Sequence, residues 1–125
     1  MIELELGNKE NIRAALEAKE IEVIDITSEE QSLKDGSKKP IISLLCKHPD
    51  AEKLIELRKV RYLKNNTLVI EGLWITKDTE GKIAKQSALG KLMEFYKVNK
   101  LSELANKKLK TSINQENYLV IKAYD

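Results

Sequence analysis

Two cations and the single tryptophan are the residues of this chain whose types and spacing best suit ligand recognition. Asn65 and Asn66 separate two apolar segments, and asparagine tolerates the positive φ of a two-residue hairpin turn. If the segments pair across that turn, Lys59, Arg61 and Trp74 share one face of the ribbon. Cations beside an indole can hold phosphates and stack a base, as surfaces for single-stranded nucleic acid do. The alternative is that Trp74 belongs to the core and that both cations reach its rim along their aliphatic stems.

Lysine dominates the stretch 85–110, where seven lysines are opposed only by Glu94 and Glu103. Such a stretch could follow the phosphates of a nucleic acid, with an affinity that falls steeply as salt rises. It could equally be a solvated helix face and a lysine-protected edge strand. The lysines assigned to a nucleic-acid interface on the first interpretation are Lys85, Lys91, Lys107, Lys108 and Lys110.

Acidic and basic residues are segregated along the chain. Residues 1–37 hold ten carboxylates and four cations, whereas the rest of the chain holds ten carboxylates and eighteen cations. The formal net charge of +2 therefore hides a basic body, which suits a polyanionic partner. The acidic residues could dock on the lysines of the same or another copy, or they could serve only solubility.

Catalytic motifs are weak in this sequence. Asp50 follows a proline and Glu80 precedes Lys82 by two residues, which is similar to the PD…ExK pattern of magnesium-dependent nucleases. Those nucleases carry the ExK residues on a strand, whereas residues 78–81 have the composition of a turn. The sequence has no glycine-rich phosphate loop, no dinucleotide motif, no nucleophile elbow and no second histidine. We therefore expect a protein that is not an enzyme and uses no cofactor, with a nuclease as a remote alternative.

A metal site is not expected either. Cys46 and His48 are the only cysteine and the only histidine, so a four-ligand zinc site would need two carboxylates. Cys46 ends the apolar run 41–46, which predicts a buried thiol. No apolar run approaches the roughly 20 residues of a membrane span, and the acidic start lacks the basic region of a signal peptide. These features predict a cytoplasmic protein that does not bind a membrane.

Two amphipathic helices are predicted. Asn8 is a suitable cap for a helix over residues 9–19, and Ser87 for a second helix that ends near Tyr96. One further helical turn is expected at residues 102–105. The apolar stripe of the second helix, which should pack on a sheet, consists of Leu89, Leu92, Met93 and Tyr96.

Short apolar segments bounded by turn residues predict the strands. They are, in order, residues 20–26, 41–47, 57–63, 68–75, 82–85, 107–113 and 118–123. Besides the Asn65 and Asn66 turn, turns are expected at 78–81 and 114–117, and the last strand should pair back antiparallel. The polar stretch 28–39 is predicted to be a loop.

The second half of the chain resembles a known architecture. Four features of this half are similar to those of small archaeal or phage-borne OB-fold-like proteins. They are the segment Gly72-Leu73-Trp74-Ile75, the turn 78–81, the helix that follows this turn and the final segment 118–121. The resemblance covers residues 57–124 and implies a helix between the third and fourth strands of a small barrel. It also implies oligonucleotide or protein binding on the sheet face formed by the early strands.

The sequence therefore predicts one α+β domain, a small, mostly antiparallel, OB-like barrel or curled sheet with one main packed helix and an N-terminal helix. Residues 1–39 would form an acidic unit and residues 40–125 the basic body. The expected function is non-enzymatic nucleic-acid binding, with single-stranded DNA or RNA as the first choice. The alternative is a protein-interaction or homodimerisation module of viral, plasmid or host-defence origin that uses a strand edge or the Leu/Met helix face.

Overall fold

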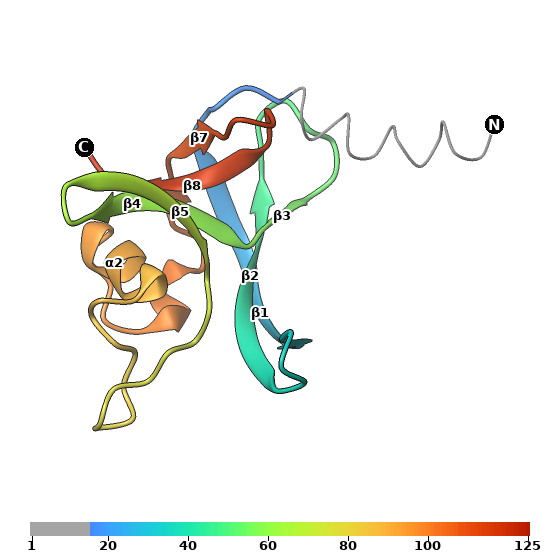
Figure 1. Cartoon of the computed structure of the whole chain (residues 1–125). Helices are drawn as coiled ribbons and strands as arrows, with labels where there is room; N and C mark the ends of the chain where they lie inside the picture. The colour runs from blue at the N-terminus through green and yellow to red at the C-terminus, as the bar shows by residue number, and fades with distance from the viewer. Residues whose placement is uncertain (1–15) are drawn as a thin grey trace.

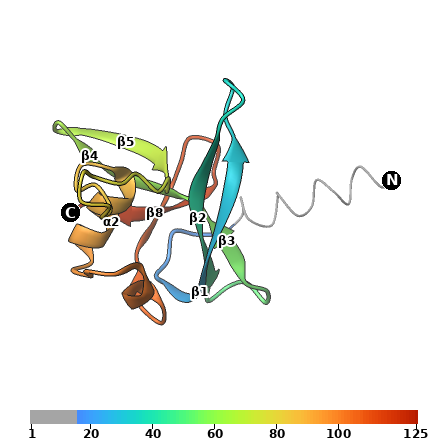
Figure 2. The same cartoon turned by 90° about the horizontal axis from the view of Figure 1, so that it is seen from below.

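A computed structural model describes residues 16–125 of the chain (Figures 1 and 2). Most of these residues lie in two four-stranded sheets, with the strand orders β3-β2-β1-β6 and β5-β4-β8-β7. The strands are β1 (Ile21–Ser32), β2 (Lys38–Lys47), β3 (Ile55–Leu57), β4 (Lys59–Lys64), β5 (Thr67–Gly72), β6 (Lys108–Leu109), β7 (Thr111–Ile113) and β8 (Leu119–Ala123). Helix α2 (Ala88–Phe95) and the 3-10 helix η1 (Leu101–Leu104) separate β5 from β6. The expected α+β class and mostly antiparallel strands are confirmed.

Two residues carry the chain from one sheet to the other. Arg58 stands alone between β3 and β4, and Lys110 stands alone between β6 and β7. Both keep ladder hydrogen bonds at the crossing, because the Arg58 carbonyl accepts from the Leu73 N–H and the Lys110 carbonyl accepts from the Lys122 N–H, each at 2.8 Å. The strands therefore follow one another in the circular order β1, β2, β3/β4, β8, β7/β6 and back to β1. Within this ring only β4 and β8 pair in parallel.

Helix α2 packs against the sheet that contains β4 and β8, as Figure 1 shows. The Ser87 hydroxyl accepts a hydrogen bond from the Gly90 N–H, so the predicted cap is confirmed. Leu89, Leu92 and Met93 are buried in the same core cluster as residues of both sheets. Tyr96, the last member of the predicted stripe, follows the helix and is half-buried.

The turn between β4 and β5 matches the sequence-based prediction in conformation and register. Asn65 and Asn66 have φ values of 51° and 65°, and Lys64 pairs with Thr67 directly across them. The left-handed glycine expected in the turn 78–81 is Gly81, with φ of 79°. The turn 114–117 and the antiparallel pairing of the last strand, with β7, are also confirmed.

Three predictions about the elements were wrong. The stretch 28–39 is not a loop, because β1 and β2 pair through it as far as Ser32 opposite Lys38. Residues 82–85 form no strand and contribute a single bridge, between Lys77 and Ile83. The strand predicted over 107–113 is divided at Lys110 between the two sheets.

The remaining predictions for the early part of the chain have mixed outcomes. The helix expected over residues 9–19 lies outside the described residues apart from 16–19, which are not helical. The strand expected over 20–26 is the first half of β1, and it contains a bulge between Val23 and Asp25. Among residues 16–125, no helix is both long enough and apolar enough to cross a membrane.

Candidate nucleic-acid interface

The side of β4 and β8 that faces away from the core is basic. Val60 and Tyr62 of β4 are buried, and alternation along the strand directs Lys59 and Arg61 to the opposite side. The parallel ladder pairs Arg61 with Lys122 of β8, so these two cations share a face with Tyr124, two residues further on. We call this surface the β4–β8 face, and it consists of Lys59, Arg61, Ser112, Lys122 and Tyr124.

Hydrogen bonds fix the centre of the β4–β8 face. The Arg61 guanidinium donates to the Ser112 hydroxyl at 2.9 Å and to the Ile113 carbonyl at 3.3 Å, both on β7. Because β8 lies between β4 and β7, the Arg61 side chain crosses over that strand. The charge of Arg61 is thereby held on the surface in one orientation rather than left mobile.

Tyr124 lies among polar and positively charged groups on this face. The Lys122 ammonium lies 4.9 Å from the centre of the Tyr124 ring, a cation–π contact. The Ser112 hydroxyl, together with the charges of Arg61 and Lys122, lowers the pKa of the Tyr124 phenol. No carboxylate belongs to the strand residues of this face in the part of the chain that the structure describes.

The outer surface of the early strands has the opposite character. Arg58 forms ion pairs with Glu29 of β1, at 3.1 Å, and with Glu56 of β3. Arg58 therefore reaches across β2, the strand between them, and its charge is neutralised. Asp25 adds a further exposed carboxylate to this surface, which is thus poorly suited to phosphates.

Trp74 lies at the junction of the two surfaces rather than in the core. Its strand leaves β4 after Gly72 and bridges to Ile41 of β2. A Cβ atom added to Gly72 would lie 2.9 Å from the indole nitrogen, so the ring rests directly on this glycine, the register partner of Lys59. The indole is half-buried, and the Lys39 ammonium lies 6.0 Å from its centre.

The five lysines of the stretch 85–110 that were assigned to an interface do not form one stripe. Lys85 lies in the loop before α2, Lys91 lies on the helix within 4.0 Å of Glu94, and Lys107 is half-buried beside β1. Lys108 pairs in register with Glu22, and Lys110 is the exposed residue between β6 and β7. Among these five lysines, Lys110 is the one whose backbone partner, Lys122, belongs to the β4–β8 face.

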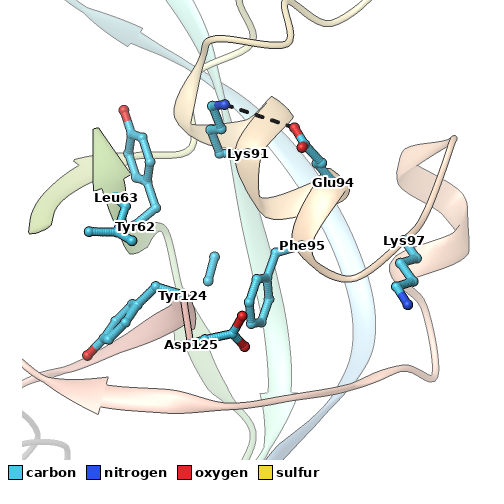
Figure 3. Close-up of a pocket in the computed structure, with 9 residues that line it drawn as sticks. Tyr62, Leu63, Lys91, Glu94, Phe95, Lys97, Tyr124 and Asp125 are labelled. Atoms are coloured by element: carbon cyan, nitrogen blue, oxygen red, sulfur yellow. Dashed lines mark ion pairs between the residues drawn. The ribbon is translucent and has the colours of Figure 1, made fainter. Parts of the chain in front are cut away.

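A pocket of about 530 Å³ opens beside the β4–β8 face. Figure 3 shows that its walls come from the end of β4, the end of α2 and the segment that follows β8. Three aromatic side chains line it, and so do two cations and two carboxylates. The residues that line the pocket are Tyr62, Leu63, Lys91, Glu94, Phe95, Lys97, Ala123, Tyr124 and Asp125.

The groups that could support catalysis or metal binding are otherwise engaged. Asp50 pairs with Lys19 at 2.8 Å, which lowers the pKa of its carboxyl group. The segments that carry Asp50 and Glu80 lie at opposite ends of the molecule in Figures 1 and 2, so the nuclease arrangement is not assembled. The buried His48 uses both ring nitrogens in hydrogen bonds, one to the Glu17 carbonyl and one from the Asp50 N–H. Among the residues that the structure describes, no three His, Cys, Asp or Glu side chains are placed to hold a metal ion.

Sequence reasoning missed Lys122, Tyr124 and Phe95 as site residues. Alternation along the last strand could have placed Lys122 and Tyr124 on one face. The parallel pairing with β4, which brings them to Arg61, joins residues about 60 positions apart and has no local signal. Comparisons with protein-family models, curated proteins and solved structures find no match for this chain.

Proposed function

We propose that this protein binds single-stranded nucleic acid, without catalysing a reaction, on the β4–β8 face. The observation that carries the proposal is the composition of that face, which combines Lys59, Arg61 and Lys122 with the ring of Tyr124 and holds no carboxylate on its strands. Cations pair with phosphates and an aromatic ring stacks a base, so these side chains supply both contacts that a single strand needs.

The strand order supports an OB-like barrel as the scaffold. The ring contains five strands if β3/β4 and β6/β7 are each counted as one. In chain order they are β1, β2, β3/β4, β6/β7 and β8, and α2 falls between the third and the fourth. This arrangement would extend the resemblance from residues 57–124 to the strands β1 and β2 as well. OB-folds commonly bind on the face of their second and third strands, and β4 belongs to the third strand here. The acidic outer surface of β1 and β3 restricts binding to the β4 end of that face.

The expected affinity is modest and salt-dependent. One stacked base contributes roughly 1–3 kcal/mol, so Tyr124 and the three cations together suit weak binding at physiological salt. Each phosphate neutralised on a single strand adds about 0.7 to the slope of log affinity against log salt.

Fluorescence anisotropy of a labelled short oligothymidylate tests the proposal. Binding should be measurable at about 50 mM salt and should weaken steeply by about 200 mM. Lys59→Gln and Lys122→Gln remove one charge each from the β4–β8 face and should each lower the salt slope by about 0.7. Lys34→Gln, at the tip of the β1–β2 hairpin, is the matched control and should leave the slope unchanged. Absence of salt-sensitive binding, or an equal effect of the control, contradicts the proposal.

A protein-interaction module is the second candidate, and one observation favours it. Leu63 and Leu68 pair across the β4–β5 turn and are 49% and 46% exposed, beside β5, which is the end strand of its sheet among residues 16–125. The Leu/Met face of α2 cannot serve this purpose, because it is buried. A dimer that survives high salt in light scattering and dissociates with Leu68→Lys would support this candidate.

A further inference from the structure

The pocket beside the β4–β8 face has the parts of a site for a single planar ring. Phe95, from the end of α2, and Tyr124, after β8, both line it, and Figure 3 shows the Tyr124 ring pointing away from Phe95. Its volume of about 530 Å³ lies within the range of small-molecule sites. Because Tyr124 belongs to both surfaces, a strand bound on the β4–β8 face could turn one base into the pocket.

The ring of Phe95 is held in place before any ligand arrives. Phe95 and Tyr96 meet edge to face, with ring centres 5.0 Å apart and an interplanar angle of 83°. Tyr96 is itself fixed, because its hydroxyl donates to the Lys122 carbonyl at 2.5 Å and accepts from the Lys110 N–H at 2.9 Å. The half-exposed Phe95 therefore presents a ring whose orientation is already set, which reduces the entropy lost on stacking.

The polar groups of the pocket differ in their availability. Lys91 and Glu94 lie 4.0 Å apart and partly satisfy each other. Asp125 makes no ion pair with residues 16–124, and it lines the pocket together with Phe95. A carboxylate only accepts hydrogen bonds, and its two oxygens can accept two parallel ones.

We infer that the pocket receives one base of the bound strand and that Asp125 makes it favour guanine. Guanine presents a ring N–H and an exocyclic amino group side by side, which a carboxylate can accept together. Thymine presents one N–H between two carbonyl oxygens, which the carboxylate repels. Lys91 and Lys97, at the rim of the pocket, are placed to contact the phosphates on either side of the inserted base. This inference rests on the proposed function, since it assigns a base preference to the same binding surface.

The test compares two oligonucleotides of equal length, one all thymine and one with a single central guanine. Their phosphates are identical, so the electrostatic contribution cancels and the difference reports the base. We expect the guanine-containing strand to bind roughly tenfold more tightly, in line with a bidentate contact. Asp125→Asn should abolish this difference and keep thymidylate binding, and Phe95→Leu should reduce the difference.

The outcomes separate this inference from the function beneath it. The pocket assignment is wrong if thymidylate binds and guanine is not preferred, or if the preference persists in Asp125→Asn. Either result leaves the proposed function unaffected. Failure of both oligonucleotides to bind overturns the proposed function. Far-ultraviolet circular dichroism of both variants establishes that they are folded, and Asp125 is exposed, so its replacement does not disturb the core.

Discussion

At the scale of single residues, Cys46 shows how burial sets chemistry. The side chain has no exposed surface, and its thiol donates only to the Leu44 carbonyl, at 3.5 Å. Burial raises the pKa of the Cys46 thiol from 9.0 to about 12, because the thiolate would lose its hydration. The prediction of a buried thiol is therefore confirmed, and we expect native protein to resist thiol reagents.

The raised pKa of Cys46 predicts a loss of stability in alkali. Between pH 9 and about 12 the thiol ionises in the unfolded chain and stays protonated in the folded one, so protons are released on unfolding. The free energy of unfolding should fall by up to about 1.4 kcal/mol per pH unit in that window from this residue. Urea titrations at several pH values measure the decline.

Cys46→Ala is the matched variant for this prediction. It lowers stability at every pH by creating a cavity, but it should also flatten the alkaline decline. Tyr62, whose pKa burial also raises to about 12, leaves a smaller residual slope. An unchanged slope in Cys46→Ala would contradict the assignment.

Residue-level predictions succeeded where the signal was local. Ser87 as a cap, the two turn asparagines and the buried Cys46 follow from their own side-chain chemistry and their immediate neighbours. The environment of Trp74 could not be predicted, because the strand changes partner from β4 to β2 after Gly72. Periodicity fixes the side of a strand and contains no information about which strand lies next to it.

At the scale of elements, the start of α2 depends on a glycine. A Cβ atom added to Gly90 would lie 2.2 Å from the Ala84 carbonyl oxygen, which belongs to the loop packed against the helix. Helix propensity alone favours alanine over glycine here by about 1 kcal/mol. The steric conflict with backbone outweighs that gain, because neither the carbonyl nor the helix can move freely.

We therefore predict that Gly90→Ala lowers the free energy of unfolding by roughly 1–3 kcal/mol, contrary to helix propensity. Thermal and urea unfolding measure the change. Gly90→Ser should be at least as harmful, since it adds the same Cβ atom. Stabilisation by alanine would show that the loop 82–87 yields without cost.

Two of the elements that were predicted wrongly depend on tertiary pairing rather than on a local sequence pattern. The segment 28–39 is polar because both faces of the β1–β2 hairpin are largely exposed there, so hydrophobic alternation is absent although the ladder continues. Its pairing depends on hydrogen bonds and on β2, not on burial. The division of residues 107–113 at Lys110 likewise reflects tertiary pairing and not sequence pattern.

At the scale of the whole molecule, the two sheets are predicted to unfold together. They share the continuous segments 55–64 and 108–113, and their buried residues form one core cluster. Neither sheet can lose its strands without opening the other, so a single cooperative transition is expected. Fluorescence of Trp74, at the junction of the sheets, should change with the same midpoint as far-ultraviolet circular dichroism. Separate midpoints would contradict this.

The charge segregation in the sequence becomes a separation in space. Acidic side chains of β1 and β3 cover one outer surface, whereas Lys59, Arg61 and Lys122 occupy another. From Ile21 onward the acidic part is built into the ring of strands, since β1 pairs with both β2 and β6. The basic character of the β4–β8 face therefore depends on which strand and which side of the sheet each cation occupies, and not on the lysine-rich stretch 85–110.

The exposed tip of the β1–β2 hairpin is a suitable site for attaching a label or a tether. Leu33 and Ser37 close it with a 2.7 Å hydrogen bond between the Leu33 N–H and the Ser37 carbonyl, and the residues between them are exposed. Loop tips of this kind accept insertions, because no core packing depends on them. A dye, an affinity peptide or a surface tether placed there would project away from the β4–β8 face and leave both that face and the pocket beside it accessible.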